Sequence, residues 1–471
     1  MDKIKILYSL VLALFIFSCA GEEKDIFSDS AANRLTKSIN EYNDLLCSSP
    51  NGWIFEYFPT TSSVGYIFLA RFEQGGFTEV ACKNKVLNGG EFLRDSSLFE
   101  VIGDNGPVLS FNTFNNIIHK FSEPYDIPST SDNESGRGYE GDYEFMLISG
   151  DKTQINLKGK KRGTRLTLRK LDENQNWENF FTHLDAIEAT MFNKGIIPLS
   201  LRMPDGNNFN LSFKKGDDSG DDTSSNGYTT EFSVYPEGGD AISQTEKVPF
   251  VVTEYGIRLN EPFEEGDYSV QRFKLAEDKS CLVSMENANI KIQSYYSVSD
   301  LFFHIMSLSN SSTDYRWTAI DSDNTMSENF ASSYKTVKES AVGAKRTLGH
   351  VGFNSSTFKS NSSWKHTAVV RLQSGALGSD GMYLFDLEKI SDSEIKTHFR
   401  GFEDGYSQEI LLRNGKTFYD ILGGLPELIN LMSTNFEITS QTGDLNPSIL
   451  RFSDKNNKEN WFDLEFITQK K

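Results

Sequence analysis

The chain has 471 residues, of which 38% are hydrophobic and 13% aromatic, and its formal net charge at pH 7 is −19. This length and composition are typical of a globular protein of two or three domains. The negative charge argues against nucleic acid or an anionic membrane surface as a partner, since both bind positively charged protein surfaces.

The N-terminal residues read as an export signal. Lysines precede an apolar run over residues 6–17, which is shorter than the roughly 20 residues that a membrane-spanning helix needs. Cys19 then follows in a context that resembles the lipobox of bacterial lipoproteins, where the signal is cut before a cysteine that takes the lipid. Bulky Phe17 departs from that pattern, and an ordinary signal peptide is the alternative. We expect residues 1–18 to be a signal peptide and Cys19 to be lipidated.

Three acidic residues, Glu22, Glu23 and Asp25, follow the cysteine. They resemble the acidic export signal that sends lipoproteins of Bacteroidota to the outer face of the outer membrane, and a soluble tether is the alternative. We therefore expect residues 19–30 to anchor and tether the protein at the cell surface through its lipid.

The first half of the chain predicts a helix and then a series of short strands. Apolar residues recur at helical spacing over 31–47, and Pro50 and Gly52 then end the helix. The predicted strands span 53–58, 65–72, 77–83, 97–102, 108–114, 143–148, 154–158 and 164–171. A second amphipathic helix is predicted over 177–192, with a hairpin of 198–203 and 209–213 after it.

The second half repeats this order of elements. Segment 382–414 reads as three strands that correspond to 143–171, and a helical stretch over 417–432 corresponds to 177–192. Further strand-like runs cover 436–439, 449–452 and 461–466. We therefore expect a mainly β fold of the α+β type, with antiparallel meander lobes that each carry one or two packed helices. A duplication into two similar lobes and an accidental similarity of order both remain open.

An acidic segment divides these halves. Residues 216–227 belong to a stretch without an apolar side chain, which is typical of a linker or a long exposed loop. The expected domains are thus an N-terminal β-rich lobe over 31–215 and a C-terminal β-rich lobe over 228–471. Four carboxylates in this segment could supply oxygen ligands to a surface calcium ion, although their spacing fails the EF-hand pattern. These candidate ligands are Asp217, Asp218, Asp221 and Asp222.

The predicted strand 53–58 holds the candidate ligand-binding residues, Trp53 and Tyr57. Strand alternation places both on one face, where aromatic rings could stack on a sugar or grip a peptide side chain. Packing of that face into the core is the default expectation, and ligand binding is the alternative to it.

No other motif predicts a catalytic or cofactor site. The signatures of zinc proteases, nucleophile-elbow hydrolases and P-loop NTPases do not occur, so we expect no cofactor and no catalytic residue. A pair of carboxylates of the glycosidase type is still compatible with the sequence.

Three cysteines remain after Cys19. We expect three buried structural thiols, at Cys47, Cys82 and Cys281, and a disulfide between Cys47 and Cys82 is the alternative.

Several segments taken together resemble a known family. They are the lipobox, "SSPNGWIFEYFP", "DNGPVLSFNTFNNIIHKFSEP" and "GYEGDYEFMLISGDKTQINLKGKKRGTRLTL". The chain resembles an uncharacterised family of Bacteroidota surface lipoproteins, the domain of unknown function 4302, closely over 27–171 and more loosely beyond. Such lipoproteins tend to accompany importers built from a TonB-dependent SusC-like channel and a SusD-like lid. The resemblance implies an accessory or ligand-capture protein for a glycan or peptide, with a surface hydrolase as the alternative, and it carries over no functional residue.

Overall fold

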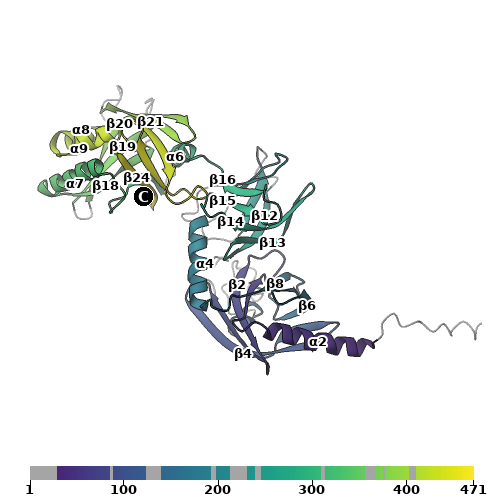
Figure 1. The fold of residues 1–471 in the computed structure, drawn as a ribbon. Helices are drawn as coiled ribbons and strands as arrows, with labels where there is room; N and C mark the ends of the chain where they lie inside the picture. The colour runs from purple at the N-terminus through teal and green to yellow at the C-terminus, as the bar shows by residue number, and fades with distance from the viewer. Residues whose placement is uncertain are drawn as a thin grey trace, which may run out of the picture.

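The structure is a computed structural model. It describes residues 29–84, 89–123, 139–192, 198–212, 231–238, 245–308, 313–355, 366–374, 377–402 and 410–470. These residues form three closed barrels of eight antiparallel strands each (Figure 1). In every barrel, consecutive strands pair with each other and the first strand pairs with the last. The prediction of a mainly β, antiparallel fold is confirmed.

Barrel 1 follows helix α2 (Ala31–Cys47), which has the predicted bounds. The hydroxyl oxygen of Ser30 caps this helix by accepting from the backbone N–H of Asn33 at 3.2 Å. The strands of barrel 1 are β1 (Trp53–Tyr57), β2 (Tyr66–Glu73), β3 (Phe77–Lys83), β4 (Phe92–Gly103), β5 (Pro107–Phe111), β6 (Glu144–Gly150), β7 (Gln154–Gly159) and β8 (Arg165–Lys170). Pairing of β1 with β8 closes the barrel, and a short 3-10 turn, η2 (His119–Phe121), follows β5.

Helix α4 (Trp177–Phe192), again with the predicted bounds, leads from barrel 1 to barrel 2. The strands of barrel 2 are β9 (Leu199–Arg202), β10 (Phe209–Ser212), β11 (Glu231–Pro236), β12 (Glu246–Thr253), β13 (Gly256–Glu265), β14 (Tyr268–Leu275), β15 (Cys281–Ser284) and β16 (Lys291–Ser294). Residues 216–227 lie outside the described residues. The strands on either side of them, β10 and β11, pair with each other. The expected lobe boundary is therefore wrong, because this segment connects two neighbouring strands of one barrel.

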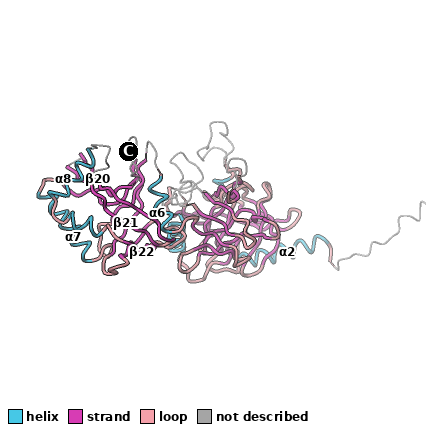
Figure 2. The backbone as a smooth tube through the Cα atoms, turned by 90° about the horizontal axis from the view of Figure 1, so that it is seen from above, coloured by secondary structure: helices cyan, strands magenta, loops and turns pink. Residues whose placement is uncertain are grey.

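Barrel 3 follows helix α6 (Val298–Ser307). Its strands are β17 (Thr313–Ala319), β18 (Thr347–Ser355), β19 (His366–Ser374), β20 (Leu377–Ser391), β21 (Glu394–Gly401), β22 (Asn435–Ser440), β23 (Ile449–Asp454) and β24 (Trp461–Lys470). Helix α7 (Glu328–Gly343) joins β17 to β18, and helices α8 (Ile410–Ile421) and α9 (Leu425–Leu431) join β21 to β22. Figure 2 shows α7 and α8 on the side of barrel 3 that faces away from the other barrels.

The suspected match between the two halves fails in barrel 3. The end of segment 382–414 was expected to be a third strand, but it enters helix α8. The helical stretch at 417–432 lies between two strands of one barrel, whereas α4 connects two barrels. The repeating unit is instead one helix followed by one eight-stranded barrel, and it occurs three times: α2 with barrel 1, α4 with barrel 2 and α6 with barrel 3.

The hydrophobic cores divide the molecule unevenly. One continuous cluster of buried side chains fills barrels 1 and 2, and a separate cluster fills barrel 3. Leu445, in the loop between β22 and β23, is fully buried in the first cluster and so ties barrel 3 to barrel 2. Its backbone N–H donates to the carbonyl of Lys279 at 3.1 Å. Barrels 1 and 2 therefore form one packing unit, with barrel 3 attached to it.

Candidate functional site

The sequence candidates for ligand binding, Trp53 and Tyr57, lie in the core of barrel 1. Both are 0% exposed, and neither lines any of the pockets described below. The indole N–H of Trp53 donates to the carbonyl of Leu46 at 2.8 Å, and the Tyr57 hydroxyl donates to the carbonyl of Asp142 at 3.0 Å. The ring of Tyr57 packs against Phe121. Strand β1 is buried on both faces because the barrel interior covers one face and barrel 2 covers the other. The structure therefore has core packing, the default expectation from the sequence, at both positions.

The remaining sequence candidates fall outside the described residues. These are Cys19 and the four carboxylates Asp217, Asp218, Asp221 and Asp222. Within the part of the chain that the structure describes, no group of three or more His, Cys, Asp or Glu side chains could hold a metal ion. Cys47, Cys82 and Cys281 are all free thiols. The disulfide between Cys47 and Cys82 that the sequence left open is therefore not formed.

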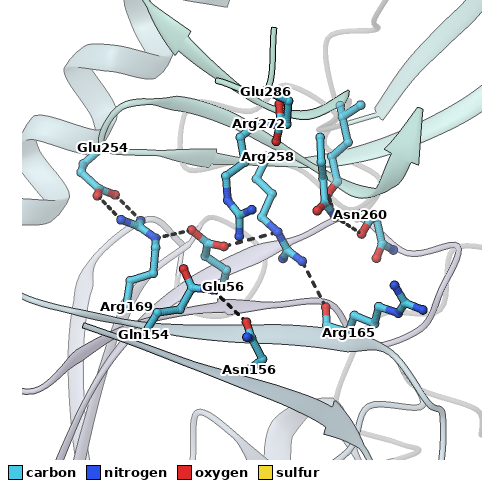
Figure 3. A network of polar contacts seen from close by, with 12 residues as sticks. Glu56, Gln154, Asn156, Arg165, Arg169, Glu254, Arg258, Asn260, Arg272 and Glu286 are labelled. Carbon is cyan, nitrogen blue, oxygen red and sulfur yellow. Dashed lines mark hydrogen bonds and ion pairs between the residues drawn. The ribbon is translucent and has the colours of Figure 1, made fainter. Parts of the chain in front are cut away.

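A buried ionic network joins barrels 1 and 2 (Figure 3). Glu56 of β1 is 0% exposed and lies between two arginines. Its Oε1 lies 2.6 Å from Nε of Arg169, and its Oε2 lies 3.4 Å from Nε of Arg258 of β13. Arg169 also binds both carboxylate oxygens of Glu254, at 2.7 and 2.8 Å. The network fixes the orientation of the two barrels, and it has no neighbouring cavity among the described pockets, so we assign it to structure.

Both arginines of this network are shifted from their ordinary pKa values. Burial lowers the pKa of Arg258, and the charge of Glu56 acts against this effect. Burial also opposes the charge of Arg169, but its hydrogen bonds to Glu254 and the charge of Glu56 raise its pKa overall.

A second set of contacts holds barrels 1 and 2 together. The side-chain amide of Asn260 donates to the carbonyls of Thr60, Thr61 and Ser63 at 3.0 to 3.2 Å.

The most distinctive surface feature of barrel 1 is an aromatic pocket of about 480 Å³. It is lined by Ser110, Phe111, Asn112, Phe114, His119, Ser122, Glu123 and Tyr143. Two of its large rings face solvent, since Phe114 is 52% exposed and Tyr143 is 41% exposed. His119 packs against both rings, with centroids 4.9 Å from Tyr143 and 5.3 Å from Phe114. Exposed aromatic side chains beside a concave polar surface are typical of binding sites.

The loop after β5 holds these rings in place. Asn115 is fully buried, and its side-chain oxygen accepts from the backbone N–H groups of Ile117 and Ile118 at 3.0 and 3.2 Å. These isoleucines are buried in the core of barrel 1 and secure the loop there. The backbone N–H of Asn115 donates to Nδ1 of His119 at 3.1 Å. Tyr143 is tied to the same strand end, because its carbonyl accepts from the backbone N–H of Phe111 at 3.3 Å. Buried anchors therefore hold the backbone that carries these rings.

The charge in the aromatic pocket is slight. Burial lowers the pKa of His119, and its backbone hydrogen bonds to Asn115 and Phe111 only partly oppose that effect. The imidazole is therefore neutral at pH 7, with Nδ1 as an acceptor. Among the described lining residues, Glu123 carries the charge.

The sequence did not reveal this site. The segment "FNTFNNIIHKF" contains Phe114 and His119, but Tyr143 reaches them only because β5 pairs with β6 in the barrel.

Two further grooves lie near barrel 3. One, of about 830 Å³, lies between α7 and the loop after β17, with an apolar floor that includes Met326 and Tyr334. Some of its charged side chains pair with each other, as where Nζ of Lys338 lies 2.6 Å from Oδ2 of Asp321. The other, of about 710 Å³, lies between barrels 2 and 3 and is lined mostly by polar side chains.

The hydrolase alternative needs two carboxyl groups across a cleft, one of them with a raised pKa. Among the described residues, Asp142 is a carboxyl group whose pKa burial raises. Its oxygens accept from the backbone N–H groups of Lys161 and Arg162 at 3.2 and 2.8 Å, and it lines none of the three pockets above. It therefore acts as a cap for the turn between β7 and β8.

The fold and its surface sites define a tandem β-barrel protein with shallow, open pockets. The chain belongs to the family described as domain of unknown function (DUF4302), whose model matches residues 23–277. This match covers α2, barrel 1 and barrel 2 as far as β14, and it stops before barrel 3. Comparison with curated proteins found no match. Across the described residues, no helix is both long and apolar enough to cross a membrane.

Proposed function

We propose that this protein is a lipid-anchored protein of the outer membrane, exposed at the cell surface, that captures a ligand without transforming it. In this proposal it is an accessory of a TonB-dependent nutrient importer of the SusC and SusD type. The observation that carries the capture role is the aromatic pocket of barrel 1, where Phe114 and Tyr143 present their rings to solvent. The N-terminal cysteine and the acids behind it support the anchored location.

The anchored location is tested by lipid labelling. Cells that express the protein are grown with a clickable palmitate analogue, and the outer membrane is then isolated. We expect label on the wild type and none on the Cys19→Ser variant, and protease added to whole cells should degrade the labelled protein. Label without protease sensitivity would contradict surface exposure while leaving the anchor in place.

The accessory role is tested by purification from outer membranes. A tagged, lipidated protein should retain an importer channel and its lid after mild detergent extraction, and Cys19→Ser should not. Repeated recovery of the protein alone would contradict the accessory role. Incubation with any captured ligand then separates binding from hydrolysis, because turnover of that ligand would favour the surface hydrolase.

A further inference from the structure

We propose that the aromatic pocket of barrel 1 binds a neutral pyranose unit of a glycan, stacked on the exposed ring of Tyr143 or Phe114. This inference rests on the proposed capture function and adds the chemical class of the ligand.

The arrangement of the rings carries the first part of the argument. His119 covers one side of each neighbouring ring, so the exposed parts of Phe114 and Tyr143 are their outer faces and edges. Tyr143 is stacked on His119 with 25° between the two ring planes, whereas Phe114 is tilted by 34° relative to His119. The exposed outer surface of either ring is a place where the apolar C–H face of a sugar can rest.

The polar lining carries the second part. Ser110, Ser122 and Asn112 supply hydroxyl and amide groups, and Glu123 supplies a carboxylate. The hydroxyl of Ser122 donates to the carbonyl of His119 at 2.8 Å and that of Ser110 to Glu144 at 3.4 Å, so each presents its oxygen to a ligand as an acceptor. Asn112 donates its amide hydrogen to Glu100 at 2.9 Å, which leaves its amide oxygen for a ligand hydroxyl. Sugar hydroxyls both donate and accept hydrogen bonds, and this mixture of groups matches them.

The charge of the described lining disfavours anionic ligands. Among the lining residues that the structure describes there is no lysine or arginine, and the Glu123 carboxylate would repel a uronate, sulfate or phosphate group. The volume of about 480 Å³ lies within the range of small-molecule sites. Because the pocket is open, one or two sugar units of a longer chain could occupy it.

The test uses the full-length protein, purified from membranes in detergent, and isothermal titration calorimetry. The probes are neutral trisaccharides of glucose, mannose, galactose and xylose in α- and β-linked forms. Trigalacturonate serves as the anionic probe, choline as the cationic probe and trialanine as the peptide probe. Tyr143→Ala and Phe114→Ala remove the exposed rings. Phe77→Ala is the matched control, because Phe77 is 58% exposed on the same barrel and does not line the pocket.

We expect at least one neutral trisaccharide to bind, with affinity about tenfold weaker in Tyr143→Ala or Phe114→Ala and unchanged in Phe77→Ala. Unchanged thermal unfolding would show that each variant is folded. Neutral-glycan binding that survives both pocket variants would overturn this site and leave the capture function intact. Binding of choline, trigalacturonate or trialanine in place of neutral glycans, with loss in Tyr143→Ala, would overturn the glycan class alone. Absence of binding across all probes would overturn both proposals.

Discussion

Trp53 of barrel 1 and Trp317 of barrel 3 make the same contact with the helix that precedes their barrel. Each is 0% exposed and lies in the first strand of its barrel. The indole N–H of Trp53 donates to the carbonyl of Leu46 in α2 at 2.8 Å, and that of Trp317 donates to the carbonyl of Phe302 in α6 at 3.1 Å. In these two units the helix and the barrel are thus joined by a buried tryptophan hydrogen bond, which supports the view that the chain repeats a helix-plus-barrel unit.

Replacing either tryptophan with phenylalanine keeps an aromatic ring but removes the indole donor. We expect Trp53→Phe and Trp317→Phe each to lower the free energy of unfolding by about 1–3 kcal/mol, because a buried carbonyl loses its partner and some volume is lost. Since barrel 3 has a separate core, urea unfolding should show two transitions, and each variant should shift a different one. Trp461→Phe, at a partly exposed position, is the control. A single transition shifted equally by both variants would contradict separate cores.

Glu56→Gln tests the joint between barrels 1 and 2. The substitution keeps the shape of the side chain and removes the negative charge that Arg169 and Arg258 face. Because Arg258 is only 3% exposed, we expect a loss of about 3 kcal/mol in the free energy of unfolding. The exposed pair of Lys170 and Glu173 provides the control, and Lys170→Ala should cost at most about 1 kcal/mol. Equal effects of the two substitutions in urea unfolding would show that the buried network adds no stability.

Gly65→Ala tests how closely the same two barrels approach. The backbone N–H of Gly65 donates to the carbonyl of Phe250 in β12 at 3.1 Å. A Cβ atom at this position would lie 2.5 Å from Cβ of Val251 and 2.6 Å from the ring of Phe58. We expect a destabilisation of about 1–3 kcal/mol, since the barrels would have to separate.

The control for that substitution is Gly343→Ala, at the end of α7. A Cβ atom there meets nothing within 4 Å, so alanine should be neutral or slightly stabilising. Thermal unfolding of the two variants compares them directly. If Gly65→Ala melts at the wild-type temperature, the barrels do not approach each other as closely at Gly65 as the structure shows.

His350 of β18 makes the stability of barrel 3 depend on pH. Burial, with the nearby charges of Arg316 and Arg371, lowers its pKa to about 3. The unfolded chain has the ordinary value of about 6.5 and therefore binds more protons than the folded chain between these values. Stability is full above pH 6.5 and falls as the pH drops toward 3.

At pH 5 the expected loss from His350 is about 2 kcal/mol relative to pH 7. Urea unfolding of barrel 3 at both pH values measures it, and His350→Gln should remove this part of the difference because glutamine does not titrate. If the wild type and the variant lose the same stability between pH 7 and 5, His350 does not carry the effect.

The sequence alone determined the local elements where one face of a segment is buried. Helices α2 and α4 were predicted with their observed bounds, because apolar residues recur along them at helical spacing and breakers or a glycine follow. The antiparallel character and the family were also readable from the sequence, the latter from distinctive segments of which all but the lipobox lie within the match over residues 23–277.

Only the tertiary structure decided how many barrels those strands make. Closure depends on pairing between strands far apart in the chain, such as β1 with β8, and alternation of side chains does not encode the partner of a strand. For the same reason the sequence did not reveal the aromatic pocket. Core packing of Trp53 and Tyr57 was the default expectation and both are 0% exposed, whereas Phe114 and Tyr143 come together at the surface because β5 pairs with β6.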